Sequence, residues 1–162
     1  HDGVAMKISK HISYEEATRS DTAERLGLNN LPGEMELASM TAVAENVFEP
    51  LRAHFCVPIG ITSFYRNKAL NTAIGGAGSS QHILGQAIDL DADKYGGITN
   101  ADIYTYIKDN LEFDTLIWEF GTDKNPAWVH VSYVPGNNRR RLLKAIKDNG
   151  RTVYRLIDTR LE

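Results

Sequence analysis

The alternation of apolar and polar residues in two short segments constrains the fold of this chain more than any other feature. In QAIDLD (86–91), Asp89 lies between two aliphatic residues. In AWVHVSY (127–133), His130 lies between two valines. Successive side chains of a β-strand point to opposite faces of its sheet. Two neighbouring strands with these sequences would therefore bury their aliphatic residues on one face and expose Asp89 and His130 together on the other.

The remaining pattern is typical of an α+β domain, with helices first and strands dominating the second half. Residues 34–54 place apolar residues at helical spacing, which predicts one long amphipathic helix despite Pro50. Other helices are expected to begin at Ser13 and to cover 67–74 and 99–111, and strands to cover 57–66, 114–120 and 127–133. Asn149-Gly150 predicts a two-residue hairpin turn, with a helix over 139–148 as the alternative.

Composition narrows the possible partners. The chain has 162 residues, 42% of them hydrophobic, which suffices for one domain, and we expect it to act as a monomer. A net charge of −3 provides no general field for nucleic acid or an anionic membrane. The basic run from Arg139 to Arg141 is interpreted as a solvated loop or strand edge. No apolar segment approaches the ~20 residues of a membrane span, and no hydrophobic signal core is present at the N-terminus.

Two further expectations concern the start of the chain and its single cysteine. Residues 1–6 are interpreted as an added remnant, so that the domain covers 7–162 and His1 has no role. Cys56 excludes an intrachain disulfide because it is alone. Within the apolar run FCVPIGI, its thiol is expected to be buried and inert.

The same alternation suggests a metal site. Gly85 permits a tight turn that would bring His82 to the strand carrying Asp89, opposite His130. Two imidazoles and one carboxylate, with a fourth position left open, are the ligand set of a catalytic zinc site. Taken one at a time, the three residues are equally typical of a turn, a surface histidine and a capped strand end.

The wider sequence pattern resembles a known family. SQHILGQAID follows the pattern S-x-H-x-x-G-x-A-x-D, the signature of the zinc D-alanyl-D-alanine carboxypeptidases and related peptidoglycan peptidases, whose fold is similar to that of the hedgehog signalling domain. ITSFYRNKALNTAIGGAGSSQH resembles the segment before the first ligand in this family, and LIWEFG followed by WVHVSY resembles the segment carrying the last. ISYEEATRSDTAERLGLNN resembles the N-terminus of compact phage and bacterial members. The resemblance implies a central antiparallel sheet with N-terminal helices packed on it.

Carried over residue by residue, the resemblance implies that His82, Asp89 and His130 bind one Zn²⁺. Ser80 matches the motif serine, whose hydroxyl would hold a ligand or the loop. Arg66 matches the arginine that meets carbonyl or carboxylate charge of the substrate. Further side chains expected behind the ligands or beside the substrate are Ser63, Trp128 and Ser132; Trp118 is interpreted as a wall of the cleft or part of the core.

The general base is the point at which this chain departs from the family. Many members carry an acidic residue three positions before the last histidine, where this chain has Ala127. Glu119 is the expected replacement, because in an antiparallel hairpin it would share the face of His130; Asp123 is the fallback. Glu119 would take a proton from water and pass it to the leaving amine, while Arg66 would stabilise the developing oxyanion.

The family implies a peptidoglycan stem peptide as substrate, without specifying a D-Ala-D-Ala, cross-bridge or L-Ala-D-Glu bond. The expected setting is a phage or prophage lytic enzyme made in the cytoplasm and released onto the cell wall. Loss of the acid at Ala127 leaves a non-catalytic zinc-containing module that binds cell-wall peptide as the alternative. An EF-hand calcium loop is excluded, because the required Gly and Glu positions hold Lys94 and Asn100.

Overall fold

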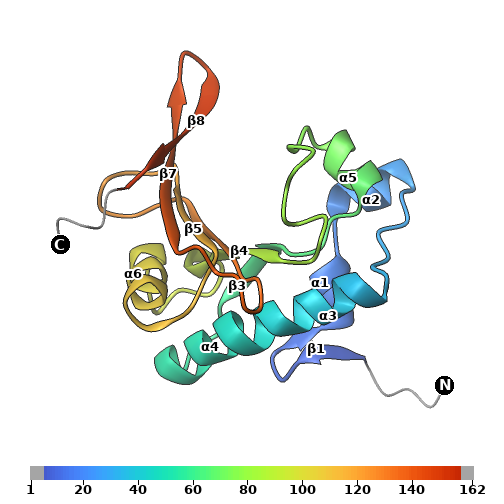
Figure 1. Cartoon of the computed structure of the whole chain (residues 1–162), viewed down its shortest axis with the longest axis horizontal. Coiled ribbons are helices and arrows are strands. Elements are labelled where there is room, and N and C mark those ends of the chain that lie inside the picture. The colour runs from blue at the N-terminus through green and yellow to red at the C-terminus, as the bar shows by residue number, and fades with distance from the viewer. Residues whose placement is uncertain (1–5, 158–162) are drawn as a thin grey trace.

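The structure is a computed structural model that describes residues 6–157 (Figure 1). The expected remnant therefore lies outside the described residues, apart from Met6. The helices are α1 (Tyr14–Thr18), α2 (Asp21–Leu26), α3 (Glu34–Val43), the π-helical η1 (Ala44–Phe48), α4 (Glu49–Phe55), α5 (Lys68–Ala73), the 3₁₀ turn η2 (Ala92–Lys94) and α6 (Asn100–Asn110). The strands are β1 (Lys7–Ser9), β2 (Ile12–Ser13), β3 (Gly60–Ser63), β4 (Ala87–Asp91), β5 (Thr115–Glu119), β6 (Trp128–Ser132), β7 (Arg141–Asp148) and β8 (Arg151–Leu156).

Six of the strands form one sheet in the order β3-β4-β6-β5-β7-β8, and β1 and β2 pair separately. Neighbouring strands of the large sheet are antiparallel except for β5 and β7, which run parallel. The chain forms the β5–β6 hairpin and then returns to the other side of β5, so β7 enters in the direction of β5. The α+β class and the central sheet are thus confirmed, with one parallel pair that the sequence did not predict.

One face of the sheet carries the core and the other is left for the site. The aliphatic residues of β4, β5 and β6 are buried on the first face, among them Ile88, Leu116 and Val129, except for Ile117, which lies opposite His130. They belong to one cluster with residues of α6 and of the long helix formed by α3, η1 and α4, which runs along the bottom of Figure 1. These helices cover the core face, and Asp89 and His130 point to the opposite face, as the alternation predicted, although their side chains are only 13% and 14% exposed there.

The long helix predicted over 34–54 is confirmed, and it continues past Pro50. Its apolar stripe is buried at Met40, Val43, Val47 and Leu51. Proline lacks an N–H group and its ring crowds the preceding turn of an α-helix. The helix widens into the π turn η1 just before Pro50, and the Glu49 N–H donates to the carbonyl of Ala44, five residues earlier. Within the described part of the chain, no helix is both long enough and apolar enough to cross a bilayer.

Side-chain caps fix several helix starts where the sequence placed them. The hydroxyl of Ser13 accepts from the Glu16 N–H at 3.0 Å, and Thr99 and Asn67 cap α6 and α5 in the same way. Ser20 caps a second short helix, so the helix expected from Ser13 is divided into α1 and α2.

The expectation for Cys56 is wrong. Cys56 ends α4 with a φ of 57°, in the left-handed region, and its side chain is exposed. The apolar run becomes buried only further along, at Ile59 and Ile61, where the chain enters β3.

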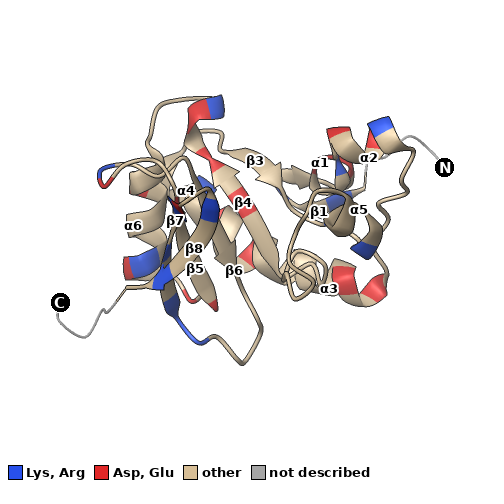
Figure 2. Ribbon diagram, turned by 90° about the horizontal axis from the view of Figure 1, so that it is seen from above, with Lys and Arg blue, Asp and Glu red and all other residues tan. Residues whose placement is uncertain are grey.

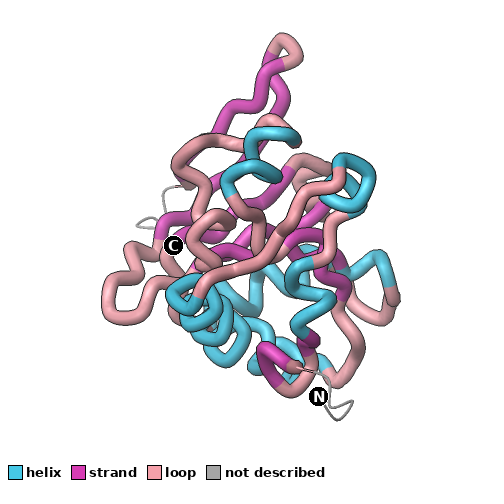
Figure 3. Tube along the Cα trace, turned by 90° about the vertical axis from the view of Figure 1, so that its right-hand side faces the viewer, coloured by secondary structure: helices cyan, strands magenta, loops and turns pink. Residues whose placement is uncertain are grey.

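The C-terminal hairpin is confirmed and the helix over 139–148 is excluded. Asn149 and Gly150 have φ angles of 52° and 77°, as a two-residue turn of type I′ requires. The hairpin of β7 and β8 projects beyond the rest of the domain in two perpendicular views (Figures 1 and 3).

Candidate metal centre

Three side chains predicted as ligands converge at the middle of the sheet. Asp89 of β4 lies opposite His130 of β6 in the strand register, and His82 comes from the turn before β4. His130 Nδ1 is 2.9 Å from Asp89 Oδ1, and His82 Nε2 is 3.2 Å from Asp89 Oδ2. The possible ligand atoms all lie within 4.8 Å of one another. One ion could therefore contact all three residues.

The tautomer of His82 favours a cation at this position. His82 Nδ1 lies 2.7 Å from the carbonyl oxygen of Phe64, which can only accept, so Nδ1 carries the proton. In the neutral ring Nε2 then presents a lone pair to the carboxylate of Asp89. A ring nitrogen and a carboxylate held this close need a positive charge between them, which is a proton on Nε2 in metal-free protein or a cation bound by both groups. Neutral imidazole and carboxylate suit Zn²⁺, and a backbone carbonyl on the far ring nitrogen is a common orienting partner of such a ligand.

Asp89 is held in its ionised form. Burial by itself would raise the pKa of Asp89, which is 9% exposed. The charges of His82 and His130, together with their hydrogen bonds, outweigh burial and hold the pKa well below its usual range. A carboxylate that remains charged is ready to bind a metal at neutral pH.

The turn that carries His82 depends on Gly85. Its φ is +73°, and a Cβ built there would lie 2.5 Å from the Glu36 carbonyl oxygen and 2.9 Å from Met40 Cγ. The turn therefore packs directly on α3 at a point where only glycine fits. This close approach fixes the position of His82 relative to the sheet.

Replacing Gly85 with alanine should destabilise the fold by roughly 2 to 5 kcal/mol, since left-handed strain adds to the clash with α3. Gly75→Ala is the matched control: Gly75 has a similar φ of +77°, but a Cβ there meets nothing within 4 Å. It should cost roughly 1 to 2 kcal/mol, from strain alone. Urea unfolding of both variants measures the difference, and equal losses would contradict the packing on α3.

Glu119 lies on the same face as the three ligands. In the register of β5 and β6, Ile117 is opposite His130 and Glu119 is opposite Trp128, as strand parity predicted. Glu119 is 6% exposed, and burial raises its pKa to about 7; the charge of His130 lowers the pKa and that of Asp89 raises it further. A carboxyl group that titrates near neutral pH is suited to accept and return a proton.

Asp123, the fallback base, is wrongly placed for that role. Its carboxylate is 92% exposed and forms an ion pair with Lys144 of β7. Leu143 lines the cavity, so the next residue along the strand, Lys144, points to the opposite face of the sheet, away from the cavity. The hydrogen bond from Lys144 lowers the pKa of Asp123. Among the described residues that line the cavity, Glu119 is the one carboxylate besides Asp89.

The raised pKa of Glu119 predicts a pH-dependent stability in metal-free protein. Between about pH 4.5 and 7 the folded chain keeps a proton on Glu119 that the unfolded chain has lost, so the free energy of unfolding should fall by about 3 kcal/mol as pH rises. Glu119→Gln should lack this fall. The depressed pKa of Asp89 acts below this window, where stability is lost as pH decreases. Denaturant unfolding at pH 5 and 8 in chelator tests the prediction; parallel pH profiles would contradict it.

Ser80 joins Arg66 to the turn of His82. The Ser80 hydroxyl accepts from the His82 N–H at 3.2 Å and from Arg66 Nη2 at 3.4 Å, and the Arg66 N–H donates to the His82 carbonyl at 3.2 Å. Burial lowers the pKa of Arg66, whereas the charge of Asp89 raises it. The guanidinium lines the same cavity as the ligands, as the family resemblance implied.

The two tryptophans lie on opposite faces of the sheet. Trp128 lines the cavity, with its ring 5.4 Å from that of Phe120. Trp118 packs edge-on against Tyr104 on the core face, and its Nε1 donates to the Thr122 carbonyl at 2.9 Å. Only Trp128 can therefore wall the cleft.

Two predicted serines serve the sheet rather than the cavity. Ser132 is fully buried, and its hydroxyl accepts the Thr115 N–H at 3.0 Å, which links β6 to β5. This burial excludes contact with substrate, so that part of the prediction is wrong. Ser63 lies opposite Asp89 in β3, next to an irregularity of the register, and is not among the described residues that line the cavity.

The ligands open into a cavity of about 950 Å³. Its walls are the loop before β4, the exposed face of β5 and β6, and the β7–β8 hairpin. The hairpin contributes Tyr154 to the cavity. In the strand register Tyr154 lies opposite Ala145, and Ala145 lies opposite Glu119. The small side chain of Ala145 therefore separates the larger side chains of Tyr154 and Glu119. Burial raises the pKa of Tyr154, and the charges of Glu119 and Asp89 add to this effect. The sequence did not predict Tyr154 at the cavity, because its position depends on the parallel pairing of β5 and β7.

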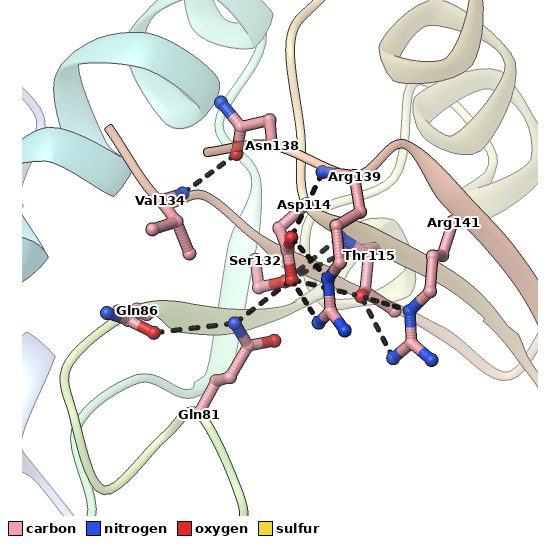
Figure 4. A network of polar contacts seen from close by, with 9 residues as sticks. All are labelled: Gln81, Gln86, Asp114, Thr115, Ser132, Val134, Asn138, Arg139 and Arg141. Atoms are coloured by element: carbon pink, nitrogen blue, oxygen red, sulfur yellow. Dashed lines mark hydrogen bonds and ion pairs between the residues drawn. The ribbon is translucent and has the colours of Figure 1, made fainter. Parts of the chain in front are cut away.

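A polar network ties the His82 loop to the sheet (Figure 4). Asp114, which is almost fully buried, accepts from Arg139 Nε at 2.9 Å and Nη2 at 2.7 Å, and from Gln81 Nε2 at 3.1 Å. The hydrogen bond from Arg139 holds the pKa of Asp114 well below its usual range. Gln81 directly precedes His82, so this contact restrains a candidate ligand. No local sequence pattern indicates this contact of Gln81.

The basic run is more structural than expected. Arg139 is bound to Asp114, and Arg140 donates to the carbonyls of Leu111 and Lys108 at 2.8 Å each, at the C-terminal end of α6. All three arginines are nevertheless exposed, Arg139 and Arg140 in the loop before β7 and Arg141 at its start, as expected for a solvated loop or strand edge.

Comparison with known families agrees with this geometry. The family model described as Peptidase M15 matches residues 10–132, which is most of the chain and includes all three candidate ligands and Glu119. No curated protein matches the chain. The α+β architecture, with helices covering one face of the sheet, is consistent with this assignment. The chain therefore belongs to the Peptidase M15 family and is a hydrolytic peptidase.

Proposed function

We propose that this protein is a zinc-dependent peptidase that cleaves the stem peptides of peptidoglycan, as a D-Ala-D-Ala carboxypeptidase or endopeptidase. The observation that carries the proposal is the convergence of His82, Asp89 and His130 beside the protonatable Glu119 in one open cavity. Membership of the Peptidase M15 family supports a peptidoglycan peptide as substrate.

The chain supplies the groups that such a reaction requires. When bound, zinc would supply Lewis acidity for peptide hydrolysis. Glu119 takes a proton from the attacking water and returns it to the leaving amine, a role that its pKa near 7 suits. Arg66 stabilises negative charge on the carbonyl oxygen from the side of the His82 turn. Trp128 forms part of the wall against which the peptide lies.

The proposed setting is lysis of a bacterial wall by a phage or prophage enzyme. It is supported by the resemblance of the segment ISYEEATRSDTAERLGLNN to compact phage-type members. Lysis of cells from without by purified protein, with the Glu119→Gln variant as the inactive control, tests this setting.

Digestion of purified muropeptides, followed by mass analysis, tests the activity. The proposal predicts a new free amine and carboxyl at one stem-peptide bond, and the mass of the fragments identifies that bond. Release of sugar fragments alone, or binding of muropeptides without cleavage, would contradict it. The second of these outcomes would instead support the non-catalytic binding module suggested by Ala127.

A further inference from the structure

The wall of the cavity formed by the β7–β8 hairpin is positively charged. Arg141 and Lys147 of β7 line the cavity, and Arg139 precedes them. Figure 2 shows basic positions along this hairpin and the segment leading into it. Among the described residues that line the cavity, the acidic ones are Asp89 and Glu119, both of which belong to the metal centre. Away from the metal centre, the cavity therefore favours negatively charged groups.

Among the described residues, no acidic side chain pairs with Arg141 or with Lys147, whose Nζ donates to the Thr152 hydroxyl at 3.0 Å. Arg139 is neutralised by Asp114, and Lys144 by Asp123. Nε and Nη2 of Arg141 each lie 3.3 Å from the hydroxyl oxygen of Thr115, a residue that is almost fully buried. Thr115 thus holds one edge of the guanidinium, whose remaining N–H groups are free to bind an anion. In Figure 4 the guanidinium groups of Arg139 and Arg141 point toward the same side, away from the sheet.

The strand register gives the distance between Arg141 and the metal centre. Arg141 is opposite Thr115, which is two residues from Ile117, and Ile117 is opposite His130. With ~4.8 Å between strands and ~3.4 Å per residue, the backbones of Arg141 and His130 are roughly 12 Å apart. The side chain of Arg141 spans part of this distance. The remaining distance between its guanidinium and the metal centre corresponds to about two to three residues of an extended peptide.

We propose that Arg141, held by Thr115, binds a carboxylate of the substrate two to three residues from the scissile bond. The enzyme would then prefer a stem peptide with a free acid at that position to the same peptide with an amide. A guanidinium matches a carboxylate in charge and in shape, whereas an amide offers a single acceptor and no charge. This inference rests on the proposed function. The residues matched by the family model end at 132, so the hairpin that carries the subsite lies beyond them.

Cleavage of paired stem peptides by the zinc-supplied enzyme tests the subsite. Each pair differs in one side-chain or α-carboxyl group, which is an acid in one peptide and an amide in the other. In one pair, kcat/KM should be about 10- to 100-fold higher for the acid, the range expected for a hydrogen bond to a charged group. Arg141→Gln should abolish that preference. The matched control is Arg155→Gln: Arg155 is opposite Lys144 and so points to the other face of the same hairpin. It should keep the preference.

The outcomes separate this inference from the proposed function. If the wild-type enzyme cleaves every acid and its amide at the same rate, or if Arg141→Gln keeps the preference, the subsite is wrong while the peptidase stands. If no peptide is cleaved, binding to the zinc-supplied Glu119→Gln protein by calorimetry still decides the question. The subsite is supported if the acid binds with a Kd about tenfold lower than the amide, or lower still, and if the further change of Arg141 to Gln removes this difference. Equal Kd values for the acid and the amide overturn it.

Discussion

Glu119→Gln should lower the rate of peptide hydrolysis by roughly 10²- to 10⁴-fold, the range expected when a general base is removed. Glutamine keeps the shape of the side chain but accepts no proton. Because a general base acts on the water only in the reaction step, the loss should appear in kcat rather than in binding of the peptide. Zinc should remain bound, since the convergent ligand atoms belong to other residues.

Asp123→Asn is the matched control for this change. Asp123 is the other carboxylate near the β5–β6 turn, but it is exposed and paired with Lys144. Its variant should keep wild-type kcat. Rates measured for both variants on one peptide, with bound zinc determined in parallel, decide between the two carboxylates. Loss of activity in the Asp123 variant with activity retained in the Glu119 variant would reverse the assignment of the base.

Asp89→Asn should weaken zinc binding by more than the 10- to 100-fold that removal of an outer-shell partner costs. The neutral amide cannot replace the charge that holds His82 and His130 in position, and it is a weaker ligand for Zn²⁺. Hydrolysis should fall with metal occupancy. Competition with a fluorescent zinc chelator measures the affinity directly.

Asp91→Asn provides the control on the same strand and the same face. The Asp91 carboxylate accepts from the Asp93 N–H and from Asn100 Nδ2 at 3.0 Å each, so it caps η2 instead of contacting the ligands. Its variant should bind zinc as tightly as the wild type, with a small loss of stability. Equal losses of zinc affinity at Asp89 and Asp91 would mean that the carboxylates act through general charge and not as a ligand.

Local sequence patterns predicted the centre of the site because they depend only on strand periodicity. The alternation around Asp89 and His130 placed both on one face, and the same rule placed Glu119 beside them. Helix starts at Ser13 and Thr99 followed from side chains that bond to their own first turn. Such features need no knowledge of how distant segments meet.

The features that the sequence did not predict depend on contacts between distant segments. Arg141 and Tyr154 reach the cavity only because β7 pairs in parallel with β5, a pairing set by the path of the chain after β6. The partner of Gln81 is 33 residues away, at Asp114. Ser132 has the correct parity, yet its hydroxyl is used by a neighbouring strand. Parity gives the face of a residue but not the depth at which it lies.

The most direct test of the site is a zinc titration of chelator-stripped protein, in which bound metal and peptide hydrolysis are followed together. If His82, Asp89 and His130 hold the working ion, the stripped protein should be inactive, and both signals should rise together and saturate at one zinc per chain. Asp89→Asn protein should show neither rise at the same zinc concentrations. Full hydrolysis by the stripped wild-type protein, or zinc-dependent hydrolysis that survives in Asp89→Asn, would contradict the metal centre described here.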